Sequence, residues 1–170
     1  MTDALDIRFL KTRNDFKQLE PFAASIWEQH YTPIIGADQV AFMLDKYQST
    51  QTMFDQFSAG YKYAVVICGD QKAGYFAYDG KAEKEVFISK LYIHKDFRRR
   101  GLGKYILDFI AKEARALGCT AITLSVNKDN SNSIQFYISC GFQTIKAQKV
   151  AIGEGFYMDD YVMSCPVQRE

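Results

Sequence analysis

The stretch of residues 86–103, with the helical pattern that follows it to Leu117, constrains the fold of this chain most strongly. Residues 86–93 alternate and are rich in β-branched and aromatic side chains, which predicts a strand, whereas from Leu102 the apolar residues recur at helical spacing. The segment RRRGLG, residues 98–103, therefore lies at a strand-to-helix turn. Free N–H groups at a helix start, the positive end of the helix dipole, three guanidinium groups and two glycines all favour a bound anion there. The sequence predicts a phosphate-binding turn.

Two familiar phosphate-binding patterns do not fit this turn. A dinucleotide fingerprint needs glycine where Ile106 stands, and a P-loop needs glycine at Arg98 and serine or threonine at Tyr105. The pattern that remains, Arg-x-x-Gly-x-Gly, resembles the pyrophosphate-binding loop of the GNAT superfamily of acetyl-CoA-dependent N-acetyltransferases. The alternative is an arginine-rich turn that only caps a helix.

A second pattern runs from Asn127 to Phe142, with Asn130, Ser133 and Tyr137 along a short predicted helix. It resembles the GNAT strand, loop and helix that follow the pyrophosphate loop and carry an asparagine and a tyrosine at this spacing. Ser133 departs from the alanine that is common in the family, a small residue replacing a small residue. The resemblance covers residues 60–165 as a core.

The remaining periodicity predicts one α/β domain in the 170 residues. Helices are expected after a cap at Asn14 or Asp15, after Asp38, and after Ser49 or Thr50, with interruptions at Thr32-Pro33 and Gly36. Short connections predict an antiparallel meander of three strands, and the right-handed crossover through the motif helix predicts a parallel neighbour for residues 86–93. The expected strands are residues 6–11, 61–68, 72–78, 86–93, 120–126, 142–151 and 156–164.

The resemblance implies a mixed, mostly antiparallel sheet of about six to seven strands flanked by helices, with a splayed central parallel pair. It divides the single N-acetyltransferase domain, residues 1–170, into two parts. Residues 1–60 would hold the first strand and the acceptor-side helices, and residues 61–170 the acyl-CoA-binding core.

The resemblance also implies that acetyl-CoA is the cosubstrate, with its pyrophosphate on the turn and its pantetheine arm against the backbone of residues 86–93. Asn130 is expected to contact this arm, to cap the following helix, or both. Isolated His30 and His94, without metal-ligand spacing, give no reason to expect a metal. The expected cofactor-binding residues are Leu91, Tyr92, Ile93, Arg98, Arg99, Arg100, Gly101, Leu102, Gly103, Lys104, Asn130, Ser133 and Tyr137.

The resemblance suggests Tyr137 as the general acid that protonates the departing thiolate, and the alternative is packing in the core beside Phe136. Family members often carry a glutamate on the strand before the arginine loop, but the central positions here are Phe87 and Ser89. Glu85 is the nearby candidate base. One alternative is that Glu85 is only a solvated charge at the end of the strand. The other is that the amine loses its proton to water in a channel, so that no dedicated base is needed.

Two further groups of residues have two interpretations. Asp159, Asp160 and Tyr161 in the last strand, with Glu154 in the preceding turn, either line a pocket for a cationic amine or belong to a solvated hairpin. Trp27 and Tyr31 either wall the same pocket or pack in the core.

The charge and cysteine patterns narrow the functional classes. With 21 basic and 20 acidic residues, the net charge of +1 gives no general attraction to nucleic acid or to membranes. Four separated cysteines without a C-x-x-C pair are typical of reduced thiols. No signal peptide or transmembrane segment is recognisable, so a soluble, cytoplasmic protein is expected.

The expected function is transfer of an acetyl group from acetyl-CoA to a primary amine. The acceptor would be a small or polyamine-like molecule rather than a protein terminus or lysine. The alternative is a catalytically inactive acyl-CoA-binding sensor or partner module. A homodimer through terminal strands is a further expectation.

Overall fold

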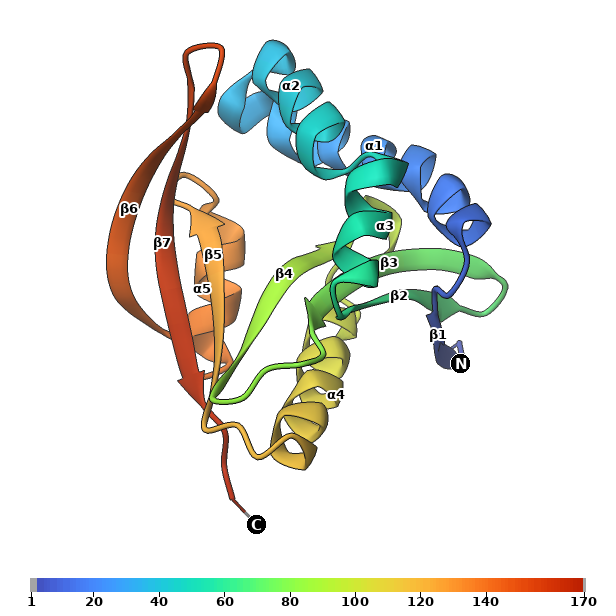
Figure 1. The fold of residues 1–170 in the computed structure, drawn as a ribbon, viewed down its shortest axis with the longest axis vertical. Coiled ribbons are helices and arrows are strands. Elements are labelled where there is room, and N and C mark those ends of the chain that lie inside the picture. Colours follow the sequence, from blue (N-terminus) through green and yellow to red (C-terminus); the bar gives the residue numbers. More distant parts are fainter. Residues whose placement is uncertain (1–2, 170) are drawn as a thin grey trace.

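The computed structural model describes residues 3–169 and contains a seven-stranded sheet with helices on both faces (Figure 1). The strand order is β1-β2-β3-β4-β5-β7-β6. The elements are β1 (Leu5–Phe9), α1 (Arg13–Ile35), α2 (Ala37–Tyr47), α3 (Thr50–Ser58), β2 (Tyr61–Cys68), β3 (Gln71–Asp79), β4 (Glu85–Ile93), the 3₁₀-helix η1 (Lys95–Phe97), α4 (Leu102–Ala116), β5 (Ala121–Asn127), α5 (Ser131–Ser139), β6 (Gln143–Gly153) and β7 (Phe156–Pro166).

Strand β3 separates the two main hydrophobic cores. Its successive side chains point to opposite faces of the sheet, and both faces are buried. Phe76 and Tyr78 pack in the core with helix α4, whereas Tyr75 and Ala77 pack in the core with α1 and α3. The two helical layers are therefore held by alternate residues of one central strand.

Strands β4 and β5 are parallel, as the crossover predicts, but they pair along only part of their length. The paired residues run from Glu85 opposite Ala121 to Ile88 opposite Leu124. On the other side of β4, Ala77 pairs with Lys90 and Tyr78 with Ile88, so Ser89 is a β-bulge. Beyond the bulge β4 leans away from β5 (Figure 1), which confirms the mixed sheet with a splayed central pair.

Helix α1 is longer than the sequence predicts. Thr12 and Asp15 form a capping box at its start, so the cap at Asn14 or Asp15 is wrong by two or three residues. The helix continues through Pro33, and the expected break at Thr32-Pro33 is also wrong because the N–H of Gly36 still bonds to the Thr32 carbonyl at 3.0 Å. Gly36, with φ of 86°, ends the helix instead.

The next two helices differ in how they begin. Ser49 caps α3 as expected, accepting the N–H of Thr52 at 3.2 Å. Asp38 does not cap α2, because that helix begins at Ala37 without a side-chain cap, and Asp38 lies within its first turn. A carboxylate at that position is still favoured by the helix dipole.

The last hairpin leaves β6 at the edge of the sheet. Ile145 and Val150 on this strand are 59% and 48% exposed. No helix within residues 3–169 has the length and hydropathy needed to span a membrane.

Candidate active site

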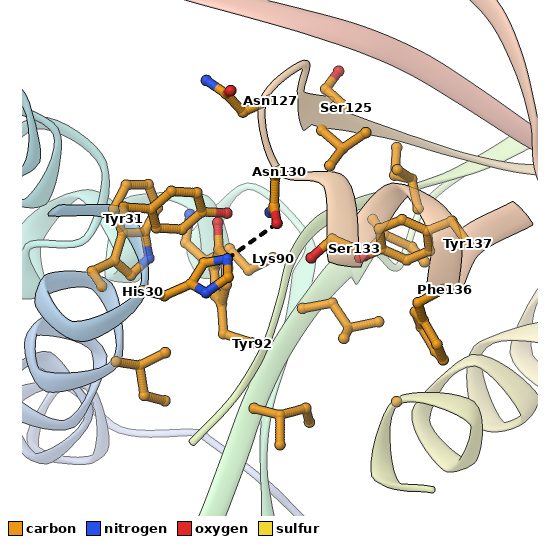
Figure 2. Close-up of a pocket in the computed structure, with 18 of the residues that line it drawn as sticks. His30, Tyr31, Lys90, Tyr92, Ser125, Asn127, Asn130, Ser133, Phe136 and Tyr137 are labelled. Atoms are coloured by element: carbon orange, nitrogen blue, oxygen red, sulfur yellow. Dashed lines mark hydrogen bonds between the residues drawn. The ribbon is translucent and has the colours of Figure 1, made fainter. Parts of the chain in front are cut away.

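The parted ends of β4 and β5 border a cavity with a volume of about 1190 Å³. Helices α1 and α2 supply another wall, and α5 and the start of α4 a third. Figure 2 shows Tyr92 and His30 on one side of it, and Ser133 and Tyr137 on the other. All the expected cofactor-binding residues line the cavity except Arg100 and Lys104.

The side chains of Arg100 and Lys104 are exposed and make contacts outside the cavity. The Arg100 guanidinium carbon lies 5.3 Å from the centre of the Phe97 ring. Lys104 Nζ lies 3.2 Å from the carboxylate of Asp108 one helical turn on. The sequence alone does not show that these two side chains, unlike Arg98 and Arg99, lie outside the cavity, because adjacent residues of a tight turn point in different directions.

The turn before α4 has the backbone geometry of an anion site. Arg99 and Gly101 have φ of 63° and 82°, and Arg98 Nε donates to the carbonyl of Ile93 at 3.1 Å, which fastens the turn to the end of β4. No described side chain caps α4, and Tyr105 is the first residue that bonds back, to the Gly101 carbonyl at 3.0 Å. The N–H groups of the first turn are thus available to a diphosphate.

Gly103 is required by packing between two helices. A Cβ at this position would lie 2.7 Å from the ring of Phe136 in α5. The absence of a side chain therefore lets the start of α4 lie against α5, which brings the turn at residues 98–103 beside Ser133 and Tyr137.

Tyr137 both packs in the core and lines the cavity, so its two interpretations are compatible. Its ring lies 5.4 Å from Phe136 and 5.5 Å from Phe142, measured between centroids. Burial raises the pKa of its phenol, and Tyr31 and Cys140 raise it further. The hydroxyl is therefore protonated at neutral pH and can donate a proton.

His30 of α1 and Asn130 before α5 meet across the cavity. His30 Nε2 lies 3.2 Å from Asn130 Oδ1 (Figure 2), so the imidazole donates to the amide oxygen. Burial and the nearby Arg98 lower the pKa of His30. Asn130 makes no side-chain cap to α5, so the capping role is wrong. Sequence reasoning missed His30, because the two residues are 100 positions apart.

Aromatic residues form one wall of the cavity. Trp27 lies 4.5 Å from Tyr31 and 5.5 Å from Tyr92 between ring centroids, and all three line the cavity. Burial, followed by the charge of Asp160, raises the pKa of Tyr31 to about 12. Trp27 and Tyr31 thus act as packing residues and as cavity walls at once.

Among residues 3–169, Asp160 is the only carboxylate that lines the cavity, and it is 6% exposed. Burial, and then the neighbouring Asp159, raise its pKa to about 6. Asp159 lies 3.0 Å from Lys128 Nζ and does not line the cavity, and neither do Tyr161 and Glu154. The pair of aspartates is therefore divided between the cavity and a surface ion pair.

Glu85 lies away from this site. It pairs with Ala121 at the closed end of the parallel strands, is exposed, and is not among the lining residues. Phe87 and Ser89 do line the cavity. The structure thus gives no support to Glu85 as the base, because the strands diverge at the far end of β4.

Residues 24–142 match the Acetyltransferase (GNAT) family. The [ribosomal protein bS18]-alanine N-acetyltransferase of Salmonella typhimurium is 27% identical over 103 residues, 59% of this chain and 69% of that enzyme. The L-ornithine N5-acetyltransferase of Arabidopsis thaliana is 34% identical over 65 residues, 38% of this chain and 28% of that protein.

Solved structures show the same fold. The PaiA N-acetyltransferase of Thermoplasma acidophilum in complex with coenzyme A has a TM-score of 0.78 and 18% identity, covering 96% of this chain and 99% of that one. The ribosomal-protein-S18-alanine N-acetyltransferase of Escherichia coli has a TM-score of 0.70 and 18% identity, with coverage of 98% and 96%. The chain therefore belongs to the acetyltransferase (GNAT) family, as an N-acetyltransferase with acetyl-CoA as its cosubstrate.

Proposed function

We propose that this enzyme transfers the acetyl group directly to a primary amine of a small-molecule acceptor. The observation that carries the proposal is a continuous cavity, which joins the turn at residues 98–103 to a pocket that contains the buried carboxylate of Asp160. A cavity of this kind has room for both substrates at once. Direct transfer needs them side by side.

The cofactor side of the cavity fits acetyl-CoA. The first turn of α4 and Arg99 would hold the pyrophosphate, and the unpaired edge of β4 around Leu91 and Ile93 would bind the pantetheine arm. When bound, acetyl-CoA supplies an activated acetyl group as a thioester. Tyr137 is the proton donor for the sulfur that leaves.

The acceptor side fits a cationic amine. Asp160 attracts the ammonium group, and with a pKa of about 6 it can also accept the proton that the amine must lose before it attacks. Trp27, Tyr31 and Tyr92 enclose the acceptor in aromatic surface. Relatives named for ornithine and thialysine support a small amine, whereas the relative named for a ribosomal protein supports a protein terminus.

Calorimetric titration with acetyl-CoA, followed by a thiol-release assay over a panel of primary amines, tests this proposal. Binding together with amine-dependent thiol release is the expected result. Binding without release from any amine would favour the alternative, an acyl-CoA sensor that has lost catalysis.

We also propose that the protein forms a homodimer through β6 and resides in the cytoplasm. The exposed Ile145 and Val150 on an edge strand support the first, and the four free thiols support the second. Light scattering of wild type and of Val150→Lys tests the dimer, which the added charge should weaken.

A further inference from the structure

Lys90 is a buried cation in the acceptor side of the cavity. The bulge at Ser89 places it in register with Ala77 of β3, which is in turn opposite Tyr63 of β2. The small side chain of Ala77 lets Lys90 lie across the sheet, with its Nζ 5.9 Å from the centre of the Tyr63 ring. In Figure 2, Lys90 is on the same side of the cavity as His30 and Tyr31.

No carboxylate in residues 3–169 lies within 4.0 Å of Lys90, although the residue is only 5% exposed. Burial lowers the pKa of its ammonium group to about 8. Buried charges in proteins are normally paired, because an isolated one loses its hydration without compensation. An anion supplied from outside the chain would provide that compensation.

The polar groups near Lys90 are arranged as hydrogen-bond donors. The hydroxyl of Tyr63 donates to Gln56 Oε1, and the hydroxyl of Tyr75 donates to Gln48 Oε1 at 2.9 Å. Because each glutamine oxygen already accepts a tyrosine hydroxyl, the NH₂ group is the part of each amide that remains to donate to a ligand. Gln48 and Gln56 both line the cavity with Lys90.

Trp27 adds an independent observation. It is 4% exposed, lines the same cavity, and its indole N–H lies close to the Tyr75 hydroxyl without forming a well-aligned hydrogen bond to any described residue. Its ring lies 5.5 Å from Tyr92, which lies 5.2 Å from Tyr75, the partner of Gln48. One ammonium, two amides and one indole thus offer protons on the acceptor side, and a carboxylate accepts at up to four positions.

We propose that Lys90, with the N–H groups of Gln48, Gln56 and Trp27, binds a carboxylate of the acceptor, so that the substrate is an amino-carboxylate. This inference rests on the proposed function and names its substrate class. Lys90 on β4 and Asp160 on β7 then bind opposite ends of a zwitterion. A polyamine would instead bring a second ammonium group to the cation of Lys90.

Matched pairs of acceptors test the carboxylate subsite. Each pair is an amino acid and the amine that its decarboxylation gives: ornithine with putrescine, lysine with cadaverine, and 4-aminobutyrate with propylamine. Thiol release is measured for wild type, Lys90→Met, Gln48→Glu and the control Lys72→Met, which changes an exposed lysine of β3. A lysine-ended peptide with a free or an amidated C-terminus shows whether the carboxylate belongs to a free amino acid or to a peptide.

Wild type should prefer the carboxylate member of at least one pair. Lys90→Met should lower that preference by about tenfold to a hundredfold, the range expected for hydrogen bonds to a charged group. Gln48→Glu should lower it too, because its new carboxylate would compete for Lys90. Lys72→Met should keep the wild-type ratio. A merely structural role for Lys90 would change both members of a pair equally.

The inference would be overturned if wild type released thiol equally fast with both members of every pair. It would also be overturned if the ratio of the two rates were unchanged in Lys90→Met. If no acceptor releases thiol, calorimetric binding of the same pairs in the presence of coenzyme A decides. Tighter, Lys90-dependent binding of the carboxylate members would uphold the subsite while the proposed transfer fails. Binding no tighter than that of the decarboxylated partners would reject the subsite itself.

Discussion

Ile88 of β4 and Leu124 of β5 form the last matched pair of the two parallel strands. Directly after them the bulge at Ser89 turns β4 away from β5, and the backbone of the two strands is left unpaired on the facing edges. The cavity begins at this point and is also bordered by the turn at residues 98–103. The separation of two strands by one inserted residue thus positions the whole site.

Tyr137→Phe tests the proton donor. The substitution keeps the ring that packs between Phe136 and Phe142 and removes only the hydroxyl. We expect kcat to fall about a hundredfold or more, with the Kd for acetyl-CoA nearly unchanged, because the proton is needed only as the sulfur leaves. Steady-state kinetics and calorimetry measure the two quantities, with Tyr157→Phe, a change of an exposed side chain of β7, as the control. An unchanged kcat would remove Tyr137 from the mechanism.

Asp160→Asn tests the acceptor carboxylate through its pH dependence. In wild type, kcat/KM should rise as the pH increases through about 6, because only the ionised form attracts the amine and takes its proton. The variant should lose that inflection and most of the activity. An inflection near pH 6 that persists in the variant would assign the titration to another group.

Asp160 also gives a stability prediction with a definite sign. Its pKa is higher in the folded chain, about 6, than the ordinary value of 3.8, so the free energy of unfolding of the wild type falls as the pH rises from about 4 to 6. Asp160→Asn should therefore be more stable than wild type at pH 7, and this advantage should shrink toward pH 4. Urea unfolding at the two pH values measures the difference, and an advantage that grows on acidification would be the wrong sign.

Lys90→Met should stabilise the protein at neutral pH. The folded state holds the Lys90 ammonium at a pKa of about 8, below its ordinary 10.5, so the charged form destabilises the fold. Removing this charge should raise the free energy of unfolding by on the order of 1–3 kcal/mol at pH 7, and the increase should shrink as the pH rises from about 8 to 10.5. Urea unfolding at pH 7 and 9.5 tests this. A variant less stable than wild type at pH 7 would contradict the burial of an unpaired charge.

Gly103→Ala tests the contact that positions the anion-binding turn. Its Cβ would lie 2.7 Å from the ring of Phe136, so α4 and α5 must move apart. We expect a loss of about 1–3 kcal/mol in the free energy of unfolding and weaker binding of coenzyme A. Adding Phe136→Leu should restore part of the stability and part of the coenzyme A binding. If the losses of the two single variants simply add in the double variant, this contact is not the cause.

Local patterns in the sequence were sufficient for much of the cofactor side. The turn at residues 98–103 joins a strand and a helix of clear periodicity, and Asn130, Ser133 and Tyr137 lie within one short helix and its start. The parallel pairing of β4 and β5 follows from the handedness of the crossover. These features depend on neighbouring residues in the chain.

The acceptor side could not be derived in this way. Strict alternation along residues 86–93 puts Lys90 on the same face as Val86 and Ile88, but the bulge at Ser89 moves it to the opposite face. His30 and Asp160 reach the cavity from a helix and a strand far apart in the sequence. Their roles depend on tertiary contacts that no local pattern records.

A crystal structure of the complex with coenzyme A would show whether the opening between β4 and β5 is the cofactor site. We expect the pyrophosphate on the N–H groups of residues 101–104, and the sulfur in the gap between β4 and β5 within hydrogen-bond reach of the Tyr137 hydroxyl. A pyrophosphate bound elsewhere, or a thiol outside the gap that opens after Ile88 and Leu124, would contradict it.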